Sequence, residues 1–234
     1  EYHFEHIVGA MKLAAEKMPR VDAIGVSSAG TFIGNAPMVA SLFIKVPRSR
    51  WDEIKTIYDR AGAAVNPDAP LLVANDGDVS ALAGAMGLGK GKLMGLAMGT
   101  SEAVGYVDKD QNVLGWINEL AFAPVDLQEG AMQDEWSTDF GVGCKYFSQD
   151  AVIKLAPFAG IEIPEDLPLA QKLKFVQKMM EEDDARAVAI FETIGAYLAY
   201  TVVLYAQFYD LDYMMLLGRV MSGKGGDAIL RVCN

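Results

Sequence analysis

Apolar residues recur along the chain with two spacings, one typical of strands and one typical of helices. Short continuous apolar runs predict strands at residues 21–26, 71–74, 93–98 and 213–217. Apolar residues three and four positions apart predict helices at about residues 7–18, 51–61, 77–88, 151–156, 169–180 and 183–209. Because strands and helices alternate through the first part of the chain, we expect an α/β protein that becomes mostly helical after residue 148.

Turn-forming residues divide this pattern. The glycine-rich stretch after Met86 predicts a boundary between two α/β domains, residues 1–90 and 91–234. The second domain is expected to open with a hairpin whose turn lies at residues 108–112. Another turn, at residues 218–226, is expected to follow the last strand. Ser49 and Asp52 are typical of the start of the helix that carries Trp51.

Composition and charge exclude several classes of protein. With 52% hydrophobic residues in 25.3 kDa, the chain can bury a substantial core. A net charge of -11 argues against a nucleic-acid-binding surface. The longest apolar stretch, residues 193–209, contains Gln207 and lacks basic flanks, so we expect a core helix and no membrane partner. Two cysteines and no recognisable signal peptide predict a cytoplasmic protein without a disulfide framework.

Candidate chemistry lies in residues 71–107, where two predicted strands end in polar segments. The first strand ends in Asn75-Asp76, and the second ends in the turn Gly99-Thr100-Ser101. An aspartate can accept the proton of a hydroxyl, while a glycine turn can offer backbone N–H groups to phosphate, so the pair favours phosphoryl transfer. Two structural alternatives stay open. Asp76 can cap the following helix, and Gly-Thr-Ser can be a simple turn.

Taken in order, the motifs resemble the ROK family of sugar kinases and sugar-responsive regulators. "VDAIGVSSAG" is similar to the strand and glycine turn ahead of the family's sugar site, and "NDGDVSALAGAMGLG" to its Asn-Asp segment and helix. "LAMGTSEAVGYV" resembles its phosphate hairpin, "NELAFAPVD" its Glu-x-Gly-His segment, and "LLGRVMSGKGG" its adenosine-side turn. The resemblance implies a ribonuclease H-like, actin-like ATPase fold in which two α/β domains flank a cleft.

The resemblance also implies roles for particular residues. Asp76 would be the general base that draws the proton from a sugar hydroxyl. Asn75 and Glu119 would hydrogen-bond sugar hydroxyls, with an exposed hairpin residue as the structural alternative for Glu119. The implied phosphate and nucleotide residues are Gly99, Thr100, Ser101, Gly218, Ser222 and Gly223. The implied ligands are ATP, Mg²⁺ and a small-molecule sugar, and the implied assembly is a homodimer.

The chain departs from the family pattern at its sugar and zinc positions. Phe122 and Tyr146 replace two polar sugar-binding residues, so we expect two aromatic rings in the substrate pocket. Only Cys144 remains of the zinc segment, and therefore no zinc is expected. Packing of four aromatic residues is expected to hold residues 129–147 instead, and these are Trp136, Phe140, Tyr146 and Phe147.

Three function classes follow from these matches and departures. The first is an ATP-dependent sugar kinase, the second a non-catalytic sugar-binding or regulatory member of the family, and the third an actin-like ATPase with a non-sugar substrate. Relatives open with an Asp-x-Gly-x-Thr hairpin that this sequence lacks, so we expect the sequence to be part of a longer kinase-like protein. A natural protein that has lost its ATPase half is the alternative. Neither the sugar nor the phosphorylated hydroxyl follows from the motifs.

Overall fold

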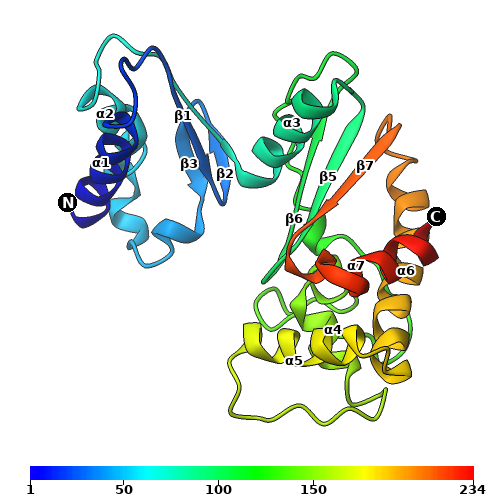
Figure 1. Cartoon of the computed structure of the whole chain (residues 1–234). Helices are drawn as coiled ribbons and strands as arrows, with labels where there is room; N and C mark the ends of the chain where they lie inside the picture. Colours follow the sequence, from blue (N-terminus) through cyan, green and yellow to red (C-terminus); the bar gives the residue numbers. More distant parts are fainter. The chain divides into compact units, whose positions relative to one another are not determined.

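The chain folds into two compact units, Glu1–Val79 and Ser80–Asn234 (Figure 1). This computed structural model describes all 234 residues. The domain boundary expected at residue 90 comes after helix α3 (Asp76–Leu88), whereas the observed division falls within α3. The glycine-rich stretch after α3 is packed in the second unit, because a Cβ atom on Gly91 would overlap the backbone of Asp108 and Lys109.

The first unit is built on the parallel pair β1 (Ile24–Ser28) and β4 (Leu71–Asn75), in which Ser28 lies opposite Asn75. The hairpin β2 (Thr31–Ile33) and β3 (Ala36–Val39) was not predicted. The remaining elements are α1 (Tyr2–Ala15), the 3₁₀ turns η1 (Ser41–Phe43) and η2 (Arg48–Glu53), and α2 (Ile57–Ala63). The single helix expected at residues 51–61 is therefore two separate pieces, η2 and α2.

The second unit contains a three-stranded sheet in the order β6 (Glu102–Val107), β5 (Leu93–Met98), β7 (Tyr213–Leu217). Strand β6 is antiparallel to β5, and β7 is parallel to it. Leu93 packs with Ala81 and Ala85 of α3. Met94 and Leu96, on the other face of β5, belong to the main core. Since both faces of β5 are covered, its sequence is a continuous apolar run.

Helices complete the second unit around the main core. They are α4 (Gln149–Leu155), α5 (Leu169–Glu181), α6 (Ala185–Tyr205) and α7 (Gly223–Cys233), with 3₁₀ turns η3 (Leu120–Phe122), η4 (Gly143–Lys145) and η5 (Arg219–Met221). Helix α7 begins inside the turn expected at residues 218–226. Figure 1 shows it beside α6, and a Cβ atom on Gly195 would approach the backbone of Ile229 too closely. Gly195 thus permits close packing of α6 and α7.

Helix α6 is long and apolar enough to cross a membrane by length and composition. In the structure its inward face is part of the main core, to which it contributes Ala187, Ile190, Phe191, Ile194 and Leu198. These contacts are those of a core helix.

Candidate functional site

Two segments assigned to nucleotide binding lie at one edge of the second sheet. Gly99 follows β5 and Gly218 follows β7, and these strands are parallel neighbours in which Ala97 lies opposite Leu217. Gly218 has a φ of 101°, and a Cβ atom there would overlap the backbone of Met98. Only glycine therefore allows the two strand ends to approach this closely.

The turn after β5 is held from two sides. Within it, the Gly99 N–H donates to the Ser101 carbonyl at 3.0 Å. The Gly99 carbonyl accepts the N–H of Gln149, the first residue of α4, at 2.9 Å. Gly99 N–H, which sequence reasoning assigned to phosphate, is thus already engaged. Thr100 at the tip is exposed.

The start of α7, where Ser222 and Gly223 were expected to border a nucleotide, already holds a carboxylate. Glu181 at the end of α5 accepts the N–H of Lys224 at 3.0 Å. The Lys224 ammonium donates to the Glu181 carbonyl at 2.9 Å and to Asp183 at 2.7 Å. Because helix N-termini attract anions, Glu181 fills the place that a phosphate group would favour.

In the first unit, Asn75 serves the fold with both ends of its amide. Its Nδ2 donates to the Gly30 carbonyl at 2.9 Å, and its Oδ1 accepts the N–H of Gly77 at 2.8 Å. Asp76 Oδ1 accepts the same N–H at the longer distance of 3.1 Å. Asn75 and Asp76 thus both accept the Gly77 N–H, Asn75 at the shorter distance, and Asp76 is the first residue of α3.

Glu119 and the two aromatic replacements have different surroundings. Glu119 is exposed and directly precedes η3, where its carbonyl accepts the Phe122 N–H at 3.2 Å. Phe122 is 36% exposed, and its ring centroid lies 5.5 Å from that of Trp136. Tyr146, in contrast, is only 2% exposed. The expectation that Tyr146 offers a ring to a substrate is corrected, because that ring lies in the core.

Tyr146 acts through its hydroxyl, which donates to Asp126 Oδ2 at 2.7 Å. Tyr197 of α6 donates to the same oxygen at 3.0 Å. Burial raises the pKa of Asp126, but the hydrogen bonds from Tyr146, Gln128 and Tyr197 outweigh burial and hold it below its usual value. Burial raises the pKa of Tyr197 to about 12. The pair of tyrosines thus fastens the loop at Asp126 to α6 through one ionised carboxylate.

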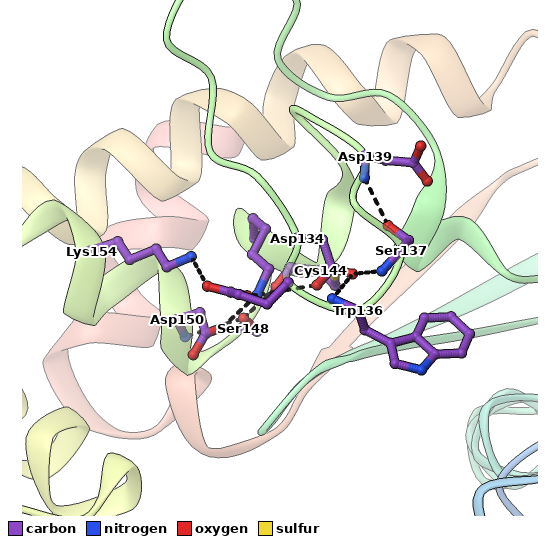
Figure 2. Close-up of polar contacts among 10 residues, drawn as sticks. Asp134, Trp136, Ser137, Asp139, Cys144, Ser148, Asp150 and Lys154 are labelled. Carbon is purple, nitrogen blue, oxygen red and sulfur yellow. Dashed lines mark hydrogen bonds and ion pairs between the residues drawn. The ribbon is translucent and has the colours of Figure 1, made fainter. Parts of the chain in front are cut away.

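A second cluster surrounds the ammonium group of Lys145, whose side chain is 6% exposed. Figure 2 shows Asp134 and Asp150, two carboxylates of this cluster. The Lys145 Nζ lies 2.5 Å from Glu135, 2.9 Å from Asp150 and 3.2 Å from Asp134. Burial raises the pKa of Asp134, yet the hydrogen bonds from the Ser137 backbone and from Lys145 bring it to about 2. Asp134 also accepts the backbone N–H groups of Trp136 and Ser137. This carboxylate therefore organises the hairpin at residues 133–140.

The expected packing of four aromatic residues is only half correct. Tyr146 and Phe147 are buried, but Trp136 and Phe140 are 69% and 62% exposed. The Lys145 cluster and the Asp126 hydrogen bonds hold the segment in their place. Burial raises the pKa of Cys144 to about 12, so its thiol stays protonated. The structure contains no group of three His, Cys, Asp or Glu side chains that could hold a metal ion.

Glu102, the first residue of β6, is a candidate that sequence reasoning missed. It is 6% exposed, and neither carboxyl oxygen has a hydrogen-bond partner. Burial raises its pKa to about 8. The hydroxyl of Tyr205 on α6 is likewise buried without a partner. The signal was the period of the strand, which places Glu102 on the same face as the core residues Val104 and Tyr106.

A cavity of about 650 Å³ opens elsewhere in the first unit. Its lining comes from the start of α1, from η2 and from α2, and includes Phe4, Arg50 and Arg60. None of the predicted site residues lines it. Arg50 is paired with Glu53 there through two hydrogen bonds.

Comparison with known proteins connects this arrangement to one fold. Neither a protein-family model nor a curated protein sequence matches the chain. Among solved structures, it is similar to a ROK family glucokinase from Streptomyces griseus in complex with glucose and AMPPNP, with 18% identity and a TM-score of 0.72, covering 97% of this chain and 77% of that one. A ROK hexokinase from Thermus thermophilus has 18% identity and a TM-score of 0.70, covering 98% and 76%.

A ROK family transcriptional regulator, described as a homolog of the E. coli MLC protein, also matches. Its identity is 15% and its TM-score 0.70, over 99% of this chain and 59% of that one. Kinases and a regulator thus share the architecture seen here. The chain has the hexokinase-like, actin-like ATPase fold of the ROK proteins, as the order of its motifs predicted.

Proposed function

We propose that this chain is the core of an ATP-dependent kinase that phosphorylates a hydroxyl of a sugar or sugar derivative. The observation that carries the proposal is the position of the candidate residues, which follow the carboxyl ends of parallel strands in both units. Asp76 follows β4 beside β1, and the Gly99 and Gly218 turns follow β5 and β7. Ligands of open α/β sheets bind at such carboxyl ends. The fold shared with a glucokinase bound to glucose and AMPPNP supports this assignment.

In the proposed reaction the side chains act mainly by aligning the reactants and stabilising charge, rather than by forming covalent bonds. Asp76 accepts the proton of the attacking hydroxyl, and Glu119 accepts hydrogen bonds from other hydroxyls of the sugar. The exposed Thr100 holds phosphate at the turn after β5. Phosphoryl transfer needs mainly alignment of the reactants and stabilisation of charge, and a rigid turn such as the one after β5 suits both. No cluster of acidic side chains forms a metal site here, so Mg²⁺ would be held largely by the phosphates of the nucleotide.

A sugar-binding regulator without catalysis is the second candidate. Two contacts favour it, since Glu181 caps α7 beside the expected nucleotide turn and the Gly99 N–H is engaged within its own turn. Both reduce what the second unit offers to nucleotide phosphates. An actin-like ATPase with a non-sugar substrate is the third candidate.

The deciding experiment measures ADP release with a panel of sugars. Asp76→Asn keeps the shape of the side chain but removes proton acceptance, and loss of a general base typically costs about 10²–10⁴-fold in rate. The matched control is Asp68→Asn, at an exposed aspartate in a surface turn of the same unit. Sugar-dependent ADP release that Asp76→Asn abolishes and Asp68→Asn leaves intact supports the kinase. Sugar binding without ADP release supports the regulator, and ADP release independent of every sugar supports the third candidate.

A further inference from the structure

An exposed pair of aromatic rings lies next to the residue assigned to sugar hydroxyls. Phe122 and Trp136 have centroids 5.5 Å apart and ring planes inclined by 38°. Trp136 is 69% exposed, although burying a tryptophan ring is strongly favourable in water. Phe122 is in the 3₁₀ turn that begins directly after Glu119. Glu119 thus lies three positions before Phe122, at the start of the turn that carries this ring.

The backbone of Trp136 is held by a hydrogen bond, while its indole ring is exposed to solvent. Figure 2 shows the indole directed away from the ion cluster, and the Trp136 N–H donates to Asp134 at 3.2 Å. Asp134 is in turn paired with the buried Lys145. Burying an ion pair is costly, and this pair holds the hairpin that presents the ring. An exposed ring on an anchored backbone loses little freedom when it binds a ligand.

The chemistry of the pair matches one kind of ligand. A pyranose ring carries C–H bonds on its faces and hydroxyls at its edge. The negative face of an aromatic ring attracts such C–H groups, and a neighbouring carboxylate accepts hydrogen bonds from the hydroxyls. Two rings are too small for a stable protein interface, which buries about 800 Å² on each partner.

We propose that Phe122 and Trp136 form a stacking platform for the C–H face of a pyranose, with Glu119 directed to its hydroxyls. This inference rests on the proposed sugar-binding function and narrows its substrate class. The platform selects closed rings with equatorial hydroxyls, such as glucopyranosides, over acyclic polyols. Trp136, the more exposed ring of the pair, becomes the residue that determines this specificity.

The test compares ligand binding by variants of the full chain. Methyl β-D-glucopyranoside is the probe, and sorbitol is the acyclic control with similar hydroxyls. Trp136→Ala should weaken binding of the glucoside roughly three- to tenfold, as expected for loss of one stacking contact. Trp136→Phe should retain most of the affinity, and Phe122→Leu should weaken binding as Trp136→Ala does. Phe140→Ala is the matched control, because Phe140 is similarly exposed on the same hairpin and pairs with no ring.

Binding is measured by calorimetry and by tryptophan fluorescence. The Trp136→Phe variant shows which part of the fluorescence change comes from Trp136. Unchanged urea midpoints verify that each variant is folded. A glucoside affinity that is the same in Trp136→Ala as in the parent, or equally weakened by Phe140→Ala, overturns the platform, as does absence of glucoside binding. Platform-dependent binding without any ADP release retains the platform and rejects the kinase. Sugar-dependent ADP release with an unchanged KM in Trp136→Ala rejects the platform and leaves the kinase intact.

Discussion

Gly143 lies against the carboxyl group of Glu102, so close that a Cβ atom at position 143 would overlap Oε2. The same Cβ would meet the carbonyl of Leu120. Gly143→Ala should therefore lower the free energy of unfolding by about 1–3 kcal/mol, the usual cost of overpacking. Urea unfolding measures the change. Gly9→Ala is the control, because nothing surrounds Gly9 in α1 and the substitution should stabilise the chain slightly. Equal stability of the parent and Gly143→Ala would contradict this packing.

Glu102 should make stability depend on pH near neutrality. Its folded pKa, about 8, lies above its unfolded value of about 4.5, so the folded state binds the extra proton between these values. The contribution is fully present below pH 4.5 and is lost as the pH rises through 8, by roughly 2–5 kcal/mol. Glu102→Gln cannot ionise and should flatten this part of the profile. Urea midpoints from pH 5 to 9 would detect it, and parallel profiles for parent and variant would rule it out.

Lys145 should be among the most sensitive positions in the second unit. Lys145→Met would leave Asp134 buried without its cation, and breaking a buried pair from one side costs about 3–5 kcal/mol. Lys154→Met is a suitable comparison, since Lys154 pairs with the exposed side chain of Glu135 and its loss should lower stability by about 1 kcal/mol or less. Denaturant unfolding of both variants measures the difference. Similar losses of unfolding free energy in the two variants would show that burial of Lys145 does not strengthen its contribution.

The lowered pKa of Asp134 predicts that the protein loses stability at acid pH. Its folded pKa of about 2 lies below its ordinary value of 3.8, so its contribution is present above pH 3.8 and is lost as the pH falls through 2. Asp134→Asn should be less stable than the parent at pH 6, and the gap should narrow toward pH 2. Thermal unfolding across this range measures the gap. A constant gap would mean that the carboxylate charge contributes nothing.

Tyr146→Phe separates the core role found here from the pocket role expected from the sequence. Removing the hydroxyl leaves Asp126 with one fewer donor and should cost about 1–3 kcal/mol of stability. Tyr197→Phe should have an effect of the same sign through the same oxygen. Because the Tyr146 ring is buried, affinity for any sugar should change less than twofold. A selective loss of sugar affinity at full stability would restore the earlier interpretation.

Sequence patterns predicted elements well where local signals and packing agree. The continuous apolar run of β5 identified a strand covered on both faces, and the turn at residues 108–112 forms as expected, with Asp108 bonded to Asn112. Helix α7 was missed because Gly223, Gly225 and Gly226 are typical of turns. Gly225 instead makes room for the ring of Phe191. That requirement comes from α6 and has no local signature.

In the candidate site, too, features with local sequence signals were predicted, and features that depend on distant partners were not. The strand ends at Asp76 and Gly99 were predicted, since they follow from run lengths and turn residues. The roles of Asn75 and Tyr146 were not, because both depend on partners far along the chain, Gly30 and Asp126. The burial of Glu102 was not predicted either, because a single acidic residue after a turn is usually exposed. Its burial depends on a glycine at position 143 in another segment.

The contact between Glu181 and the first turn of α7 also has a consequence for how the chain folds. The helix has 11 residues and three glycines in its first four positions, so it is too short and too flexible to form alone in water. Its capping carboxylate lies 43 positions earlier, at the end of α5. We therefore expect α7 to form late, after α5 and α6 have created the surface on which it docks. Hydrogen exchange should find the amides of α7 among the first to open in the second unit.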